Sequence, residues 1–234
     1  MSNASFQFRQ FTVYQDQCAM KVGTDGVLLG AWARLLATEG RVLDMGTGTG
    51  LLALMMAQRY PHASVTAVDI DDQAVIQAQQ NISRSPFAER ITISQGDIRE
   101  WEDQPFDAIV TNPPYFVDSL ICPDDQRTTA RHTGTLTYRE LMETAWHLLS
   151  DNGIFSVVIP FDYLDRLSSE AALVGFFLSR QCAVRTTPRK SPRRYLLEWV
   201  KHPCTLQRTE EVLETAPLTR SPWYQSLTHE FYIK

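Results

Sequence analysis

The sequence of 234 residues lacks long apolar runs, a leader-like N-terminus and any excess of positive charge. No stretch approaches the ~18 consecutive apolar residues that a membrane span requires. The first residues show no basic stretch followed by an apolar one, so no signal peptide is expected. With 11 glycines and 12 prolines, the chain is not collagen-like or of low complexity. These absences favour a globular protein of the cytoplasm.

Closely spaced cysteines are also missing. Cys18, Cys122, Cys182 and Cys204 are scattered along the chain, and no pair has CxxC spacing. The five histidines do not cluster with them, which argues against structural zinc and thioredoxin-like chemistry. We therefore predict no metal site and reduced thiols.

The net charge of -5 argues against a general nucleic-acid binder, but the charges are unevenly distributed. Residues 1–160 carry 11 Lys and Arg against 19 Asp and Glu, whereas residues 161–234 carry 11 against 8. The densest basic stretch contains no acid and consists of Arg185, Arg189, Lys190, Arg193 and Arg194. Such a patch on an acidic body either binds a phosphate backbone or forms a solvated loop.

Short β-branched runs alternate with helical patterns, which predicts an α/β fold with a doubly wound, mostly parallel, seven-stranded sheet. Thr137 and Glu140 form a capping box for one helix, and Thr24 or Asp25 is expected to cap the first helix. The polar stretch 205–222 has no clear assignment. The expected strands are 41–45, 64–69, 91–95, 106–111, 154–159, 182–186 and 195–201, and the expected helices are 27–37, 51–59, 71–83, 137–149 and 163–178.

A glycine-rich turn follows the first expected strand of the sheet. Its pattern is Asp44-x-Gly46-x-Gly48-x-Gly50, and Asp69 ends the next strand. Glycine lets a backbone adopt positive φ and come close to a ligand. An acid at the end of the second strand reaches the ribose hydroxyls of a bound nucleoside.

Two cofactor classes use this layout, and a ligand-free turn is the third alternative. A dinucleotide fingerprint requires a small residue at position 51, where this chain has Leu51. Asp44 inside the strand suits a cationic ligand better than a pyrophosphate, so we favour S-adenosyl-L-methionine. Asp97 closes the third strand and is a candidate acceptor for the adenine amino group, although such an acid also serves as a helix N-cap.

The tetrapeptide Asn112-Pro113-Pro114-Tyr115 follows the fourth expected strand. The prolines rigidify the backbone and remove N–H donors. The Asn112 side-chain oxygen and the Pro113 carbonyl can accept two hydrogen bonds from one planar NH2 group, and Tyr115 can stack on a flat ring. The pattern predicts a clamp that positions an exocyclic amine or an amide nitrogen for methyl transfer, catalysed by positioning and electrostatics without a metal. The alternative is a Pro-Pro turn without a ligand.

These motifs together resemble the class I amino-methyltransferases, which have a Rossmann-like fold. More specifically, residues 21–26, 28–32, 112–115 and 130–133 are similar to the bacterial family that N6-methylates adenine-37 of a valine tRNA. The resemblance implies S-adenosyl-L-methionine as donor, S-adenosyl-L-homocysteine as product, and tRNA as acceptor. It makes Thr24 and Asp25 candidate cofactor contacts. It also implies one methyltransferase domain over 1–234, with 1–40 covering the cofactor, 41–160 binding it, and 161–234 forming the sheet edge and contacting RNA.

Candidate RNA contacts lie in two places. One is the polar loop after the tetrapeptide, with Arg127 and Arg131. The other is the basic stretch, with Arg189, Lys190, Arg193 and Arg194. Solvated charge is the competing interpretation in both places, and no obligatory protein partner is indicated.

Other activities remain open from sequence alone. A protein glutamine N5-methyltransferase acting on a release factor shares the tetrapeptide, but usually has a separate N-terminal helical domain. A DNA adenine methyltransferase normally carries a target-recognition insertion, which is not visible here. A non-catalytic S-adenosyl-L-methionine sensor or a dinucleotide-binding module is the alternative of another class. Asn112 and Tyr115 argue against the sensor, and Leu51 argues against the dinucleotide.

Overall fold

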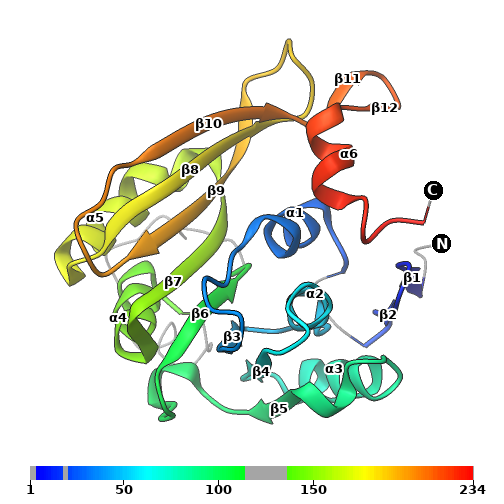
Figure 1. Cartoon of the computed structure of the whole chain (residues 1–234), viewed down its shortest axis with the longest axis vertical. Coiled ribbons are helices and arrows are strands. Elements are labelled where there is room, and N and C mark those ends of the chain that lie inside the picture. The colour runs from blue at the N-terminus through cyan, green and yellow to red at the C-terminus, as the bar shows by residue number, and fades with distance from the viewer. Residues whose placement is uncertain (1–3, 18–20, 114–135, 234) are drawn as a thin grey trace, which may run out of the picture.

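An eight-stranded, mostly parallel sheet forms the centre of the protein. The computed structural model describes residues 4–17, 21–113 and 136–233 (Figure 1). The strand order is β10-β8-β9-β7-β6-β3-β4-β5, and β9 runs antiparallel to both of its neighbours. The strands are β3 (Arg41–Met45), β4 (Ser64–Asp69), β5 (Ile91–Gln95), β6 (Phe106–Thr111), β7 (Leu149–Pro160), β8 (Phe177–Arg185), β9 (Pro192–Val200) and β10 (Gln207–Val212).

Helices cover both faces of this sheet, and each face has its own apolar core. On one face lie α1 (Thr24–Trp32), α2 (Leu51–Arg59), α3 (Asp72–Ser83) and α6 (Pro222–Thr228) (Figure 1). On the other lie α4 (Tyr138–Leu148) and α5 (Leu164–Val174). Two small hairpins, β1 (Ser5–Gln7) with β2 (Thr12–Tyr14) and β11 (Glu214–Ala216) with β12 (Thr219–Arg220), lie outside the main sheet. None of the helices in the described part of the chain combines the length and apolar character of a membrane span.

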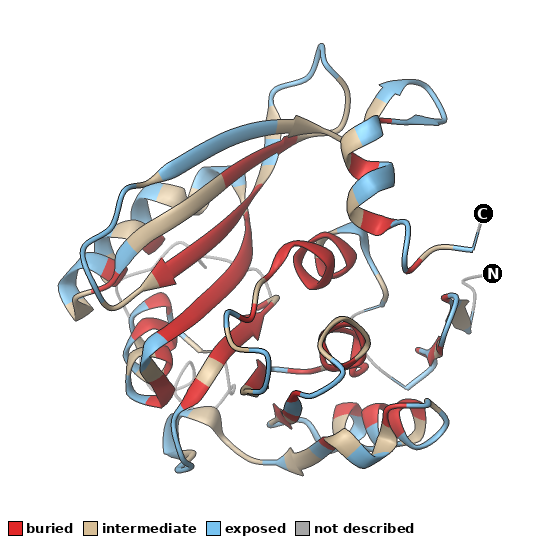
Figure 2. Cartoon of the chain, viewed as in Figure 1, coloured by how far each residue is buried: buried red, intermediate tan, exposed pale blue. Residues whose placement is uncertain are grey.

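Helix α1 is buried along almost its entire length between the sheet and α2 (Figure 2). Two glycines one helical turn apart allow this close approach. A methyl group on Gly26 would lie 2.9 Å from Leu51 Cδ2, and one on Gly30 would lie 2.6 Å from Met55 Sδ. Because a side chain at either position would overlap α2, these glycines set how deeply α1 sits.

The order of the strands reverses at β3. From there β4 and β5 extend to one side and β6 and β7 to the other, so β3 and β6 flank the topological switch point. The carboxyl ends of parallel strands at such a point leave a crevice in which ligands bind. The turns after β3 and β6 therefore face the same space.

The predicted fold class is confirmed, with one strand more than the seven expected. The additional strand is β10, which pairs in parallel with β8 and whose residues are mostly exposed. An edge strand in contact with water does not need the apolar alternation that identifies buried strands. No strand could therefore be predicted within the polar stretch 205–222.

Several element ends differ from the prediction. The first helix spans Thr24–Trp32 instead of 27–37. The predicted cap by Thr24 or Asp25 is wrong, because Gly23 is the N-cap, no side chain among the described residues caps the helix, and both residues belong to its first turn. The helix predicted over 163–178 ends at Val174, because its C-cap Gly175 adopts a φ of 107°. Strand β8 then begins at Phe177. The capping box of Thr137 and Glu140 is present.

The basic stretch lies at the end of the sheet that carries the crevice. Pro160, the last residue of β7, pairs with Arg194 at the start of β9. Because β9 is antiparallel to β7, the connection from β8 to β9 emerges beside the carboxyl ends of the parallel strands. The strand directions therefore place residues 186–191 at the same sheet edge as Asn112.

Candidate functional site

A cavity of about 260 Å³ opens at the carboxyl ends of β3, β4, β5 and β6. It brings together six of the residues singled out in the sequence, from four different strand ends. These are Gly46, Gly48, Asp69, Asp97, Asn112 and Pro113. The walls are completed by Met45, Val68, Ile70, Asp71, Ala74, Gly96, Ile98, Arg99, Thr111 and Leu136.

The three glycines after β3 play different parts. Gly46 and Gly48 have positive φ values of 71° and 55°, and a methyl group on either would meet no atom of the described residues within 4 Å. Their backbone thus faces open space at the cavity. Gly50, with φ 81°, is the N-cap of α2, and a methyl group there would lie 3.3 Å from the Ala78 side chain. Gly50 therefore serves helix packing and does not line the cavity.

Asp44 is completely buried directly below this turn. Its Oδ2 accepts hydrogen bonds from Thr47 Oγ1 (2.5 Å) and the Ala53 amide (3.0 Å). Its Oδ1 has no hydrogen-bond partner among the residues that the structure describes. Burial raises the pKa of Asp44 to about 7, although the bonds from Thr47 and Ala53 oppose that shift. A cation placed above the turn would favour the ionised form of this carboxyl group.

Asp69 connects the turns after β3 and β4. Its Oδ2 accepts the Gly48 amide (2.8 Å), and its Oδ1 accepts the Asp71 amide (3.0 Å). Because each carboxylate oxygen has more than one lone pair, Asp69 retains acceptor capacity toward the cavity. Two backbone hydrogen bonds thus hold the carboxylate where a diol could bind.

Asp97 serves both as an N-cap and as a cavity residue. It accepts the Arg99 amide (3.0 Å) at the start of a 3-10 turn, Ile98–Glu100, and it pairs with the Arg99 guanidinium. The hydrogen bond from Arg99 lowers the pKa of Asp97, so the carboxylate stays ionised. The arginine also reaches Glu140 of α4 (3.4 Å).

Sequence reasoning missed the apolar walls of the cavity. Ile70 and Ile98 each follow the acid that ends a strand or begins a turn, and both line the cavity together with Leu136. The repeated Asp-Ile dipeptide at positions 69–70 and 97–98 was the available signal. Such aliphatic side chains provide contacts for the flat faces of a purine.

Asn112 and Pro113 lie at the end of β6, one strand from the glycine turn. Thr111 Oγ1 donates to the Met45 carbonyl (2.7 Å), which ties the end of β6 to the end of β3. Asn112 is half-buried and Pro113 is buried, and both line the cavity. The two described residues of the tetrapeptide therefore border the same space as Gly46 and Asp69.

The remaining predicted residues lie elsewhere. Thr24 is exposed in the first turn of α1, and neither it nor Asp25 lines the cavity. Asp25 forms an ion pair with Arg194. Arg189, Lys190 and Arg193 are exposed around the β8–β9 connection. Pro114, Tyr115, Arg127 and Arg131 lie outside the described residues.

Comparison with known proteins places this architecture among methyl-transferring enzymes. Residues 23–177 match the methyltransferase small domain family. A tRNA1(Val) (adenine(37)-N6)-methyltransferase from Bacteroides fragilis is 49% identical over 241 residues and covers 100% of both chains. Proteins of the same name from Bacteroides thetaiotaomicron (46% identical, 100% of this chain and 99% of the relative) and Tolumonas auensis (41%, with the same coverage) are also similar.

Solved structures support the fold at much lower sequence identity. A predicted O-methyltransferase from Agrobacterium tumefaciens is 16% identical and superposes with a TM-score of 0.71, covering 88% of this chain and 96% of its own. The glycopeptide N-methyltransferase MtfA, solved with S-adenosyl-L-methionine, is 14% identical with a TM-score of 0.57, covering 78% of this chain and 100% of its own.

Proposed function

Because this chain belongs to the methyltransferase small domain family and, within it, to the tRNA1(Val) (adenine(37)-N6)-methyltransferases, we propose that it methylates N6 of an adenine in tRNA. The donor is S-adenosyl-L-methionine, and the acceptor is adenine-37 of a valine tRNA. One observation carries the proposal. Asn112 and Pro113 line the same cavity as the glycine turn and Asp69. We further propose that the protein works in the cytoplasm without an obligatory protein partner.

The residues at the carboxyl ends of β3, β4 and β5 fit this donor. Gly46 and Gly48 leave open space that side chains would fill, and Asp44 retains a buried oxygen without a partner among the described residues. Asp69 would accept the ribose hydroxyls, and Ile70 and Ile98 would contact the adenine ring. When bound, S-adenosyl-L-methionine supplies a methyl group activated by a sulfonium. Asp44 would compensate that positive charge from below the turn.

The acceptor side works by orientation. The exocyclic nitrogen of adenine is a weak nucleophile, because its lone pair is delocalised into the ring. Asn112 Oδ1 and the Pro113 carbonyl would each accept a hydrogen bond from one N–H of this amine. Holding both N–H groups favours a pyramidal nitrogen and directs its lone pair toward the methyl group of the donor. Positioning of this kind lowers the barrier through proximity and electrostatics. As the nitrogen–methyl bond forms and the sulfur–methyl bond breaks, the nitrogen releases one of its two protons to water.

Access to the base is easier in an anticodon loop than in a duplex. Extruding a loop base costs little stacking and pairing energy, so the enzyme does not have to open a helix. Arg189, Lys190 and Arg193, exposed at the same sheet edge as Asn112, are the described candidates for phosphate contacts. Arg127 and Arg131 remain candidates from sequence.

The test is to supply S-adenosyl-L-methionine carrying a labelled methyl group to the protein together with separate pools of tRNA, protein and DNA. We expect label in tRNA, and nuclease digestion followed by chromatography should recover it as N6-methyladenosine at position 37 of a valine tRNA. Label in the protein pool on a glutamine amide, or in DNA, would show that the clamp serves another acceptor.

A further inference from the structure

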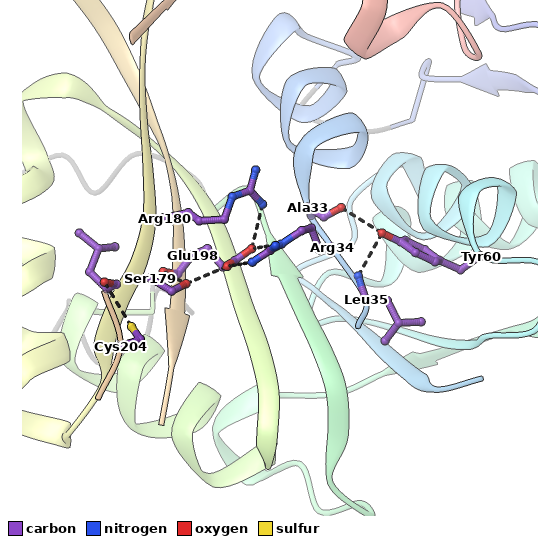
Figure 3. Close-up of polar contacts among 9 residues, drawn as sticks. Ala33, Arg34, Leu35, Tyr60, Ser179, Arg180, Glu198 and Cys204 are labelled. Atoms are coloured by element: carbon purple, nitrogen blue, oxygen red, sulfur yellow. Dashed lines mark hydrogen bonds and ion pairs between the residues drawn. The ribbon is translucent and has the colours of Figure 1, made fainter. Parts of the chain in front are cut away.

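Helix α1 is attached to strand β9 by an ion pair at each end. Near its start, Asp25 pairs with Arg194, and each side chain is only 18% exposed. Just beyond its last residue, Arg34 donates two hydrogen bonds to Glu198 (2.9 and 2.6 Å), which is completely buried (Figure 3). The two partners on β9 are four residues apart, so they lie on the same face of the strand.

The spacing of these charges matches on the two elements. From Asp25 to Ala33, the C-cap residue that precedes Arg34, α1 advances about 12 Å, at 1.5 Å per residue. From Arg194 to Glu198 a strand advances about 13 Å, at 3.3 Å per residue. The signs also agree with the helix dipole, because the acid is near the N-terminus of α1 and the arginine follows its C-terminus. A shift of α1 along β9 would break both pairs.

The position of α1 matters because its first turn borders the Asn112 side chain. A methyl group on Gly26 would lie only 3.8 Å from Asn112 Nδ2. Gly26 directly follows Asp25, so the ion pair with Arg194 acts on the turn that borders the Asn112 amide. Any displacement of this turn changes the space into which that side chain is packed.

We propose that Asp25 and Arg194 are positioning residues for methyl transfer, which hold the first turn of α1 against Asn112 and so orient the acceptor clamp. This inference rests on the proposed function, since it assumes that Asn112 binds the acceptor nitrogen. It assigns both residues to turnover, whereas the sequence suggested Asp25 as a cofactor contact and Arg194 as a phosphate contact.

The neighbouring residue offers a direct contrast. Arg193 is exposed, whereas Arg194 lies on the face of β9 that α1 covers. The pairing of β9 with β8 is irregular at this point, because Val184 pairs with Arg194 whereas Arg185 pairs with Pro192, and the two adjacent arginines meet different environments. Arg193 is available to a phosphate backbone, and Arg194 is engaged by α1.

The test compares Arg194→Gln and Asp25→Asn with two matched variants. In each of the first two we expect kcat for tRNA methylation to fall by about 10- to 100-fold, as small misplacements of reacting groups do. The KM for tRNA and the Kd for S-adenosyl-L-methionine should not change. Arg193→Gln should instead raise the KM for tRNA. Arg139→Gln, which breaks an exposed ion pair within α4, should change none of these quantities.

Double and conservative variants separate positioning from general destabilisation. Because both changes break the same ion pair, Asp25→Asn/Arg194→Gln should reduce kcat no further than either single variant does. Arg194→Lys retains the charge and should recover part of kcat. Melting temperatures are measured for all variants, and a kcat loss that follows the melting temperature through this series overturns the positioning role.

Hydrogen exchange keeps this inference distinguishable from the proposed function. Faster exchange of the amides of α1 near Gly26 in Arg194→Gln, without RNA present, supports the ion pair as the anchor of that turn. If wild-type protein methylates no tRNA, the proposed function fails and the exchange result still stands. If wild-type protein is active and Arg194→Gln retains full kcat, or Asp25→Asn weakens cofactor binding while kcat persists, the inference is wrong.

Discussion

Two carboxylates without any solvent exposure lie on the same sheet, and their surroundings are opposite. Asp44, under the glycine turn, accepts hydrogen bonds from one hydroxyl and one amide of the described residues, and burial raises its pKa to about 7. Burial also acts to raise the pKa of Glu198 on β9, but hydrogen bonds from Arg34 and Ser179 and the charge of Arg180 lower it (Figure 3).

The difference distinguishes the proposed binding region, at the carboxyl ends of β3 to β6, from a scaffold region, where α1 packs against β8 and β9. A buried acid with few hydrogen-bond donors is costly in its ionised form unless a nearby positive charge compensates it. A buried acid that already has two arginines and a hydroxyl connects parts of the fold. The edge of β3 to β6 leaves acceptor groups facing a cavity, whereas the interface of α1 with β8 and β9 satisfies its charges internally. Substitutions in the first region should therefore affect catalysis and binding, and those in the second should affect stability and positioning.

The largest effect should come from Asn112→Ala in the binding region. We expect turnover to fall on the order of 10²-fold or more, because one positioned acceptor for the reacting amine is removed. Cofactor affinity and melting temperature should stay close to those of the wild type. Single-turnover kinetics with saturating tRNA measures the loss, and calorimetry checks the cofactor. Normal methylation by this variant would disprove the clamp.

Asp69→Ala should weaken S-adenosyl-L-methionine binding by about 1–3 kcal/mol, the cost of leaving polar groups unpaired. The substitution also leaves the Gly48 and Asp71 amides without the carboxylate to which they donate hydrogen bonds. Asp72→Ala, in the exposed first turn of α3, is the matched control and should bind normally. Calorimetric affinity equal to that of the wild type would remove Asp69 from the cofactor site.

In the scaffold region, Glu198→Gln should lower the free energy of unfolding by about 1–2 kcal/mol, since charge-assisted hydrogen bonds to Arg34 and Arg180 are weakened. Cofactor affinity should not change. Glu210→Gln breaks the more exposed pair with Arg185 and should cost at most about 1 kcal/mol. Equal losses in the two variants, measured by urea unfolding, would contradict the contrast between buried and exposed pairs.

The two buried acids should also give stability opposite dependences on pH. Because the pKa of Asp44 is raised in the folded state, its protonated form stabilises the fold at low pH. This contribution to the free energy of unfolding is lost as the pH rises through about 7. Because the pKa of Glu198 is lowered in the folded state, its ionised form stabilises the fold when the pH is above the pKa of an unfolded Glu, about 4.3. This contribution is lost as the pH falls below that value. Asp44→Asn and Glu198→Gln should each remove one of these slopes from unfolding curves measured across that range. Parallel curves for both variants would show that the two acids titrate alike.

The smallest effect concerns the exposed arginines and lysine beside the site. Replacing Arg189, Lys190 and Arg193 together with Ala, while keeping Arg194, should raise the KM for tRNA. Removing each phosphate-binding side chain should reduce the log–log salt slope by roughly 0.7–0.9. Cofactor affinity should be unaffected. An unchanged slope would leave this stretch as a solvated loop and redirect the search to Arg127 and Arg131.

The amino-acid sequence by itself determined the class of fold and six of the residues that line the cavity. Gly46, Gly48 and Asp69 follow strands with strong apolar patterns, and Asn112 stands in a distinctive tetrapeptide. Parallel strands bring their carboxyl ends to one edge, so local motifs at those ends meet without any further information.

Only the tertiary structure decided the roles of the charges and the edge of the sheet. Asp25 pairs with a residue 169 positions away, and Glu198 reads in the sequence as an ordinary polar residue of a strand. In the sequence, Gly50 cannot be told apart from Gly46 and Gly48, but in the fold it packs against α3. Strand β10 lacks the apolar alternation by which a buried strand is predicted. These outcomes depend on which surfaces are packed together. Backbone propensity and periodicity act over a few residues, whereas partners and burial arise only when distant segments meet.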